Sequence, residues 1–189
     1  MKTLWIDSQF EYDGSQLRSL FAYLEYGILG DSMVAWVGPC QIPFDKMVDG
    51  EDKRLGAEIR GAQMVHFIGE FHNASLLAGV ALQRLMASMV KDVMLDLSSD
   101  KALALRLRRD GDDLYVGENK LSISIATASP TSTLLHFAVN AVNRGTPVPT
   151  ISLEEFAIDA KVFSQEVLSR FQKEYESVVN ATQKVHWVR

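Results

Sequence analysis

A lysine, a cysteine and a histidine–asparagine pair are the side chains of this sequence whose types and positions could carry chemistry. Lys120 begins a predicted strand after the turn Gly117-Glu118-Asn119. Its ammonium there could hold a carboxylate or phosphate and stabilise negative charge at a reacting centre. Cys40 follows Gly38-Pro39, and a thiol becomes a nucleophile when a nearby cation lowers its pKa. The ordinary alternatives are an exposed hairpin lysine and a buried, unreactive cysteine.

His136 and Asn140 share one face of a predicted strand, because side chains alternate with a period of two. Two polar residues on an otherwise apolar strand are unusual unless they face a cavity, so we expect both to bind a ligand. A hydrogen-bonded core histidine is the alternative. The histidines lack the spacing of a metal motif, and no metal site is expected. They are His66, His72, His136 and His186.

Further polar residues in the first third of the chain are candidates for ligand binding. Arg18 lies on a predicted helix, where a surface ion pair is the alternative. Asp31 and Ser32 precede a strand and could equally serve a turn. The acidic residues between 45 and 52 either hold Mg²⁺ for a nucleotide or are simply solvated.

The composition excludes several classes of protein. The chain has 189 residues, of which 47% are hydrophobic and 23% charged, and a formal net charge of −5. Without a basic block it is a poor nucleic-acid binder, and no apolar run is long enough for a membrane span. The N-terminus lacks the zones of a signal peptide, and one cysteine cannot form an internal disulfide. We therefore expect a cytoplasmic protein with no nucleic-acid or membrane partner.

The predicted elements are helical towards the ends of the chain and mostly strands in the middle. The 40–60 stretch is predicted as a long surface loop, and Ser152 with Glu155 as a capping box that starts a C-terminal helical region. Together they predict an α+β fold, a single domain over 1–189 with a mostly antiparallel central sheet packed with helices. Strands are predicted at 3–6, 33–37, 64–71, 103–107, 113–116, 120–126 and 133–142, and helices at 16–26, 75–90 and 152–179.

The order of elements between 64 and 142 resembles the catalytic fold of biotin and lipoate protein ligases, which is class II synthetase-like. The strand Met64-Val65-His66-Phe67-Ile68 leads into an alanine-rich helix, and a lysine-led strand then precedes Leu134-Leu135-His136-Phe137-Ala138-Val139-Asn140. The resemblance implies that Lys120 takes the place of the family's substrate-binding lysine, with Asn140 near its asparagine. It also implies that Asp113 is the acidic start of the preceding strand.

The whole chain also resembles the domain of unknown function 366 family of archaeal and bacterial proteins. The segments that carry this resemblance include Gly30-Asp31-Ser32-Met33, Met47-Val48-Asp49-Gly50 and Arg109-Asp110-Gly111-Asp112. The chain departs from the ligases in two places. It lacks their glycine- and arginine-rich loop before the strand at 64, and Ser122-Ile123-Ser124 replaces the glycine that follows their lysine.

These observations lead to two alternative hypotheses for the function. The first is acyl transfer or ligation on a small ligand that carries a carboxylate or phosphate, with Lys120 or Cys40 as the catalytic group. The second is a non-catalytic ligand-binding protein or homodimer that keeps the fold, which the missing loop favours over an ATP-dependent ligase. The sequence identifies no cofactor.

Overall fold

The computed structural model describes residues 1–188, which form one central sheet, a small second sheet and two long helices. No helix within this range is long and apolar enough to cross a membrane. The elements are β1 (Lys2–Trp5), α1 (Phe21–Tyr26), β2 (Ser32–Gln41), the 3-10 turn η1 (Phe44–Lys46), α2 (Gly50–Leu55), β3 (Arg60–His72), α3 (Leu76–Leu97), α4 (Lys101–Ala104), β4 (Arg108–Asp110), β5 (Asp113–Val116), β6 (Asn119–Lys120), β7 (Ser122–Ala128), β8 (Ser132–Val142) and α5 (Ala160–Gln183).

The central sheet has the strand order β1-β2-β3-β8-β7, and only the β1–β2 pair is parallel. The small sheet has the strand order β4-β5-β6. Its last strand, β6, directly precedes β7 of the central sheet in the chain. The predicted α+β fold with a mostly antiparallel sheet is therefore confirmed.

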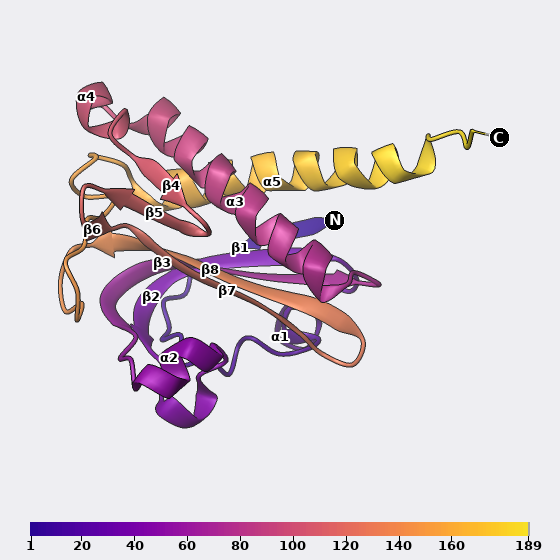
Figure 1. Cartoon of the computed structure of the whole chain (residues 1–189), viewed down its shortest axis with the longest axis horizontal. Helices are drawn as coiled ribbons and strands as arrows, with labels where there is room; N and C mark the ends of the chain where they lie inside the picture. The colour runs from indigo at the N-terminus through magenta and orange to yellow at the C-terminus, as the bar shows by residue number, and fades with distance from the viewer. Residues whose placement is uncertain (189) are drawn as a thin grey trace.

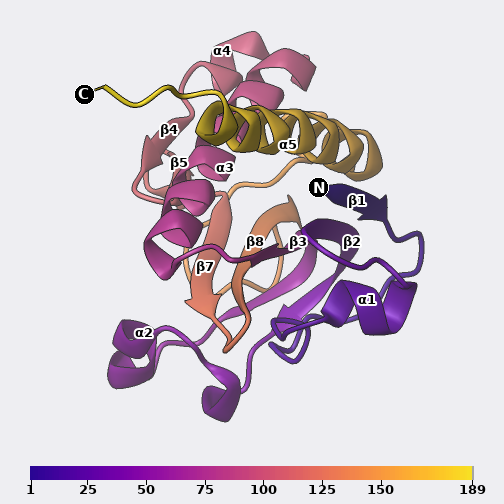
Figure 2. The same cartoon turned by 90° about the vertical axis from the view of Figure 1, so that its right-hand side faces the viewer.

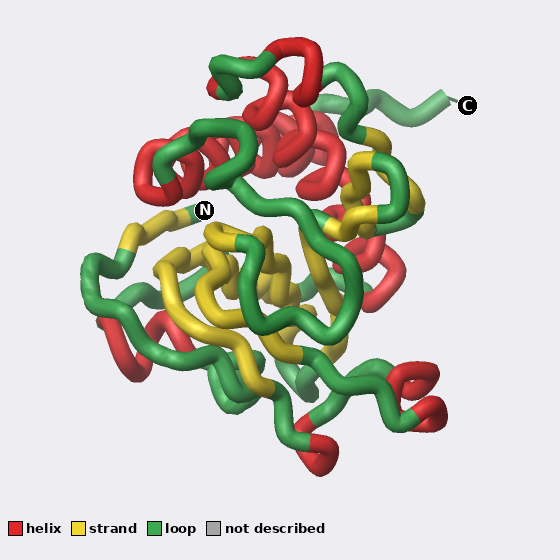
Figure 3. The backbone as a smooth tube through the Cα atoms, turned by 90° about the vertical axis from the view of Figure 1, so that its left-hand side faces the viewer, coloured by secondary structure: helices red, strands yellow, loops and turns green. Residues whose placement is uncertain are grey.

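The two long helices α3 and α5 cover one face of the central sheet, and α1 and α2 lie on the other (Figures 1 and 2). The helix-covered face holds the larger apolar core, which includes Phe67, Phe137 and Phe163. The opposite face, here called the cavity face, carries a smaller apolar cluster around Trp36 and Ile68. Loops and short helical turns, rather than long helices, cover the cavity face (Figure 3). Such a cover leaves room for a cavity.

Several predicted elements differ from the structure, among them three whose ends moved or whose type changed. The strand predicted to end at Gly38-Pro39 continues to Gln41, because Pro39 sits at a bulge where the pairing register with β3 shifts. The segment 103–107 holds the end of α4 and a turn instead of a strand, because the side chain of Asp100 caps that helix at Leu103. Ser152 does bond to Glu155, yet the helix begins only at Ala160, capped by Asp159.

Gly38 allows the N-terminal segment to cross the cavity face. A Cβ at this position would lie 1.8 Å from the carbonyl oxygen of Phe10. The same carbonyl accepts a 3.0 Å hydrogen bond from the indole of Trp36 on β2. The segment that carries Tyr12 is thus held against the sheet through a contact that only glycine permits.

Replacing Gly38 by Ala should destabilise the protein by about 1–3 kcal/mol, because the clash is with backbone and cannot be relieved by a rotamer change. Gly50 is the matched control, since a Cβ there meets nothing within 4 Å. Urea unfolding of both variants measures the difference. A Gly38→Ala protein as stable as Gly50→Ala would contradict the close approach.

Candidate functional site

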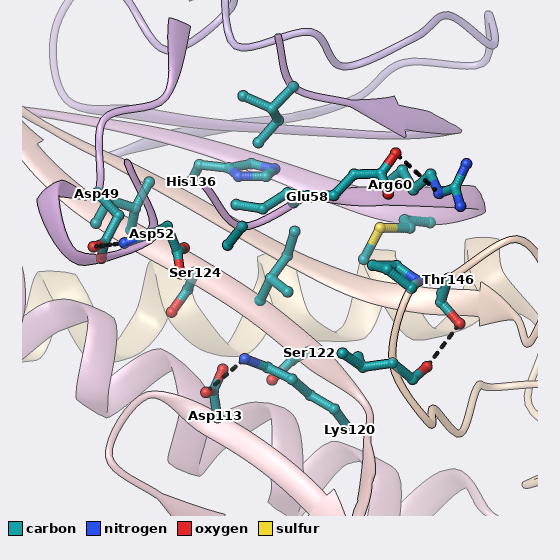
Figure 4. Close-up of a pocket in the computed structure, with 18 of the residues that line it drawn as sticks. Asp49, Asp52, Glu58, Arg60, Asp113, Lys120, Ser122, Ser124, His136 and Thr146 are labelled. Carbon is teal, nitrogen blue, oxygen red and sulfur yellow. Dashed lines mark hydrogen bonds and ion pairs between the residues drawn. The ribbon is translucent and has the colours of Figure 1, made fainter. Parts of the chain in front are cut away.

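A cavity of about 630 Å³ opens on the cavity face, between the sheet, the 42–60 segment and the small hairpin. Its floor comes from β7, β8 and β3, where Ile123, Ile125 and Met64 present apolar side chains. Its rim is strongly charged (Figure 4). The charged lining residues are Lys46, Asp49, Glu51, Asp52, Glu58, Arg60, Asp112, Asp113, Glu118 and Lys120.

Lys120 lies on the cavity wall opposite Tyr115 in the hairpin, and its side chain forms an ion pair with Asp113, two residues before Tyr115 on β5. The Lys120 Nζ atom is 2.8 Å from Oδ2 of Asp113, which also accepts a 3.1 Å hydrogen bond from the hydroxyl of Tyr115. Burial alone would lower the pKa of Lys120, but the hydrogen bond and charge of Asp113 outweigh it and the pKa is raised. The ammonium is therefore charged and held in place, with further N–H donors left for a ligand.

Asn140 fixes the backbone on which Lys120 stands. Its side-chain amide donates to the carbonyl oxygens of Lys120 at 3.1 Å and Ile151 at 3.2 Å. The side chain lines the cavity, but its N–H groups are used by the backbone. Asn140 thus positions Lys120, and its oxygen is the atom left to face a ligand.

His136 lies in the cavity wall on the same face as Asn140, as the alternation along the strand predicts. Its ring is 1% exposed, and Nε2 lies 3.1 Å from Nδ1 of the fully buried His66 on β3. Burial lowers the pKa of His66 to about 4. Burial and the neighbouring His66 also hold the pKa of His136 well below its usual value. Both imidazoles are neutral at neutral pH.

Cys40 is not placed as a nucleophile. The thiol is buried in β2, 2% exposed, and does not line the cavity. Burial, together with the charge of Glu11, raises its pKa to about 12, which leaves almost no thiolate at neutral pH. The expectation of a loop cysteine fails because β2 runs through Pro39.

Arg18, Asp31 and Ser32 lie away from the cavity. Arg18 is exposed and pairs with Glu25 at 2.6 Å, the surface ion pair that was its alternative. Asp31 accepts hydrogen bonds from the backbone of His72 at 2.7 Å and the hydroxyl of Tyr175 at 2.6 Å. Ser32 is buried at the start of β2. The structure does not bring these three residues to the site.

Sequence reasoning missed Asp112 at the rim, and it named Asp52 among the acidic candidates without placing it beside Lys120. Asp112 accepts hydrogen bonds from Gln83 and Ser124, each at 2.7 Å, and from Arg84, which ties α3 to the edge strand β7. Asp52 on α2 lies near Lys120, and burial and the charge of Asp49 raise its pKa. The acidic run was visible in the sequence, but no local pattern places it against a hairpin some 60 residues later. The described part of the chain groups no three metal-ligating side chains.

Comparison with known proteins places the chain in a family. The model of "Domain of unknown function (DUF366)" matches residues 1–186. The chain belongs to the DUF366 family. A solved protein of unknown function from Pyrococcus horikoshi is 39% identical, with a TM-score of 0.92 over 99% of this chain and 98% of that one.

The DUF366 chain also shares the fold of biotin and lipoate ligases. A biotin protein ligase mutant from Aquifex aeolicus in complex with biotin superposes with a TM-score of 0.60 at 16% identity, over 93% of this chain and 70% of that one. P. falciparum LipL1 in complex with lipoate gives 0.59 at 12% identity, over 100% and 64%. The predicted ligase-like fold is confirmed.

The buried histidine pair should make the protein lose stability as the pH falls. An unfolded histidine titrates near pH 6.5, whereas His66 in the fold titrates near 4. Its contribution is therefore complete above pH 6.5 and declines down to about pH 4, because only the unfolded state takes up the proton. His66 alone should remove about 2 kcal/mol between pH 7 and pH 5.

Urea unfolding of the wild-type and His66→Gln proteins at the two pH values measures this contribution. The variant should lose less stability on acidification than the wild type. His186→Gln serves as the control because His186 is exposed, and it should behave as the wild type. Equal pH dependence in wild type and His66→Gln would show that His66 is not buried as a neutral group.

Proposed function

We propose that this protein binds a small organic acid in the cavity, with the carboxylate at Lys120 and the apolar body along the sheet. The observation that carries the proposal is the placement of Lys120. Its side chain is 29% exposed, against 37% for Lys46 and 52% for Arg60, the other cations of the lining. A charge-assisted hydrogen bond is strongest where water is partly excluded, so Lys120 is the best anion partner in the cavity.

The apolar floor supports a ligand with a hydrocarbon body. Ile123, Ile125 and Met64 line the cavity with apolar side chains beside the polar rim. Small-molecule sites typically combine such a surface with a few polar groups that fix orientation. The ligands named with the structural neighbours, biotin and lipoate, are both carboxylic acids with an alkyl chain. This chemistry matches the cavity.

The charge of the rim favours a ligand with one negative charge over a polyphosphate. The charged lining comprises seven acidic and three basic side chains, an excess of four negative charges among the described residues. Arg60 and Lys120 are already paired with Glu58 and Asp113. A single carboxylate can share Lys120 with Asp113, whereas a triphosphate would meet mostly repulsion unless a divalent cation accompanied it.

Acyl transfer or ligation is the second candidate function, and the ligase-like fold supports it. Because the thiol of Cys40 is buried and protonated, the transfer would join two bound substrates instead of passing through a thioester on the chain. A product formed from lipoate or biotin, ATP and an acceptor amine would support it. Binding without any product would leave the protein a ligand-binding member of the fold.

Replacing Lys120 by Met should weaken the binding of lipoate, biotin or octanoate about 10- to 100-fold, because one hydrogen bond to a charged group is worth about 1.5–3 kcal/mol. Isothermal titration calorimetry of the purified chain measures the affinity. Met keeps most of the apolar stem of lysine and removes only the charge.

Lys161 provides a matched control, because it forms a similar lysine–aspartate pair with Asp7 far from the cavity. Lys161→Met should bind these acids as the wild type does. Wild-type protein that binds none of the three acids would contradict the proposed function. Equal affinity of Lys120→Met and wild type would remove Lys120 from the site.

A further inference from the structure

Two buried histidines form a directional chain of hydrogen bonds that ends at the cavity. Nε2 of His66 lies 3.2 Å from the carbonyl oxygen of Gly38, and Nδ1 of His66 lies 3.1 Å from Nε2 of His136. Nδ1 of His136 has no hydrogen-bond partner within residues 1–188, although it is not one of the fully buried unpaired atoms, and this residue lines the cavity. An unpaired ring nitrogen that is not fully buried can accept a hydrogen bond from water or from a ligand group.

The chain of contacts determines where each proton lies. The carbonyl of Gly38 can only accept, so Nε2 of His66 must carry a proton and donate to it. In a neutral ring Nδ1 of His66 is then an acceptor, and Nε2 of His136 must be the donor to it. The proton of His136 is thereby placed on Nε2. Its Nδ1 is left with a lone pair that borders the cavity.

Ring stacking holds both imidazoles in this orientation. The ring of Tyr12 lies 3.7 Å from that of His136 between centroids, tilted by 16°. The indole of Trp36 stacks on His66 at 5.1 Å. Tyr12 and Trp36 are themselves buried. A preoriented acceptor gives specificity because it need not be ordered when the ligand binds.

We propose that Nδ1 of His136 is a fixed, neutral hydrogen-bond acceptor that recognises an N–H or O–H group on the ligand's head. The inference rests on the proposed function, since it concerns the same cavity. His136 recognises the donor without removing its proton, because a buried imidazole with a histidine neighbour is a weak base. His66 is the positioning residue that selects the tautomer.

The sheet separates the backbone positions that support the two recognition points. Asn140, which holds the backbone of Lys120, and His136 are four residues apart on β8, or about 13 Å along the strand. Ile123 and Ile125 lie beside this stretch on β7. In Figure 4 His136 and Lys120 lie on opposite sides of the cavity. The ligand class is therefore an elongated acid with a hydrogen-bond donor at the end remote from its carboxylate.

The tautomers can be read directly by long-range ¹H–¹⁵N NMR of the full chain labelled at its histidines. We expect His66 and His136 to be neutral at pH 7 with the proton on Nε2. A proton on Nδ1 of His136 would overturn the inference. His66→Gln should preserve the His136 tautomer, because the glutamine amide can both donate to Gly38 and accept from His136. His66→Phe offers neither group, so His136 should then populate both tautomers.

A small neutral donor tests recognition separately from the carboxylate. Ethyleneurea, a cyclic urea with two N–H groups, should shift the His136 Nδ1 signal saturably, while its N,N′-dimethyl analogue should not. His136→Phe keeps the ring stacking. It should weaken ethyleneurea binding about three- to tenfold, because it removes one neutral hydrogen bond.

These results separate the inference from the proposed function. An unchanged His136 signal in ethyleneurea would overturn the acceptor role even if lipoate binds at Lys120. Conversely, a saturable shift with no binding of any organic acid would keep the acceptor and reject the carboxylate site. Should His136→Phe fail to fold, the wild-type titration with the two ureas still decides.

Discussion

The arrangement of the cavity face depends on one constraint, that polar side chains buried in the middle of a sheet must find hydrogen-bond partners. An unpaired buried polar group costs about 1–3 kcal/mol, a large share of the stability of a domain this size. Glu70, 4% exposed, meets the constraint through the backbone N–H of Leu20 at 2.9 Å and the hydroxyl of Ser132 at 2.6 Å. His66 meets it through Gly38, and Asn140 through the carbonyl of Lys120. Each partner lies in a different segment, so the same bonds fix the segments that surround the cavity.

The chemistry open to the cavity follows from this arrangement. Because Asn140 holds its backbone, Lys120 is presented from a rigid hairpin instead of a mobile loop. The acidic residues of the rim restrict the anion that can approach it, and the neutral histidine pair adds an acceptor but no charge. The ligase-like fold thus carries a site suited to recognition, with no activated nucleophile of its own at Cys40.

Strong local patterns predicted much of the fold. The features that they did not predict are set by contacts between residues far apart in the sequence. The alternation along 133–142 placed His136 and Asn140 on one face, and Ser75 caps α3 as its type suggests. Leu20 in a left-handed conformation, φ 62°, shortens the predicted helix at 16–26, because its N–H points to Glu70, 50 residues away. Lys120 and His136 could be named from the sequence. The partner of Lys120, Asp113, lies in the same hairpin, whereas His66, the partner of His136, comes from another strand 70 residues away and no spacing rule predicts it.

The most direct test of the central claim is a crystal structure of the full chain with bound lipoate. We expect the carboxylate within hydrogen-bond distance of Lys120 Nζ, with the hydrocarbon part against Ile123 and Ile125 on the cavity face. Lipoate bound elsewhere, for instance beside Asp31 and Tyr175, with the cavity unoccupied, would contradict it.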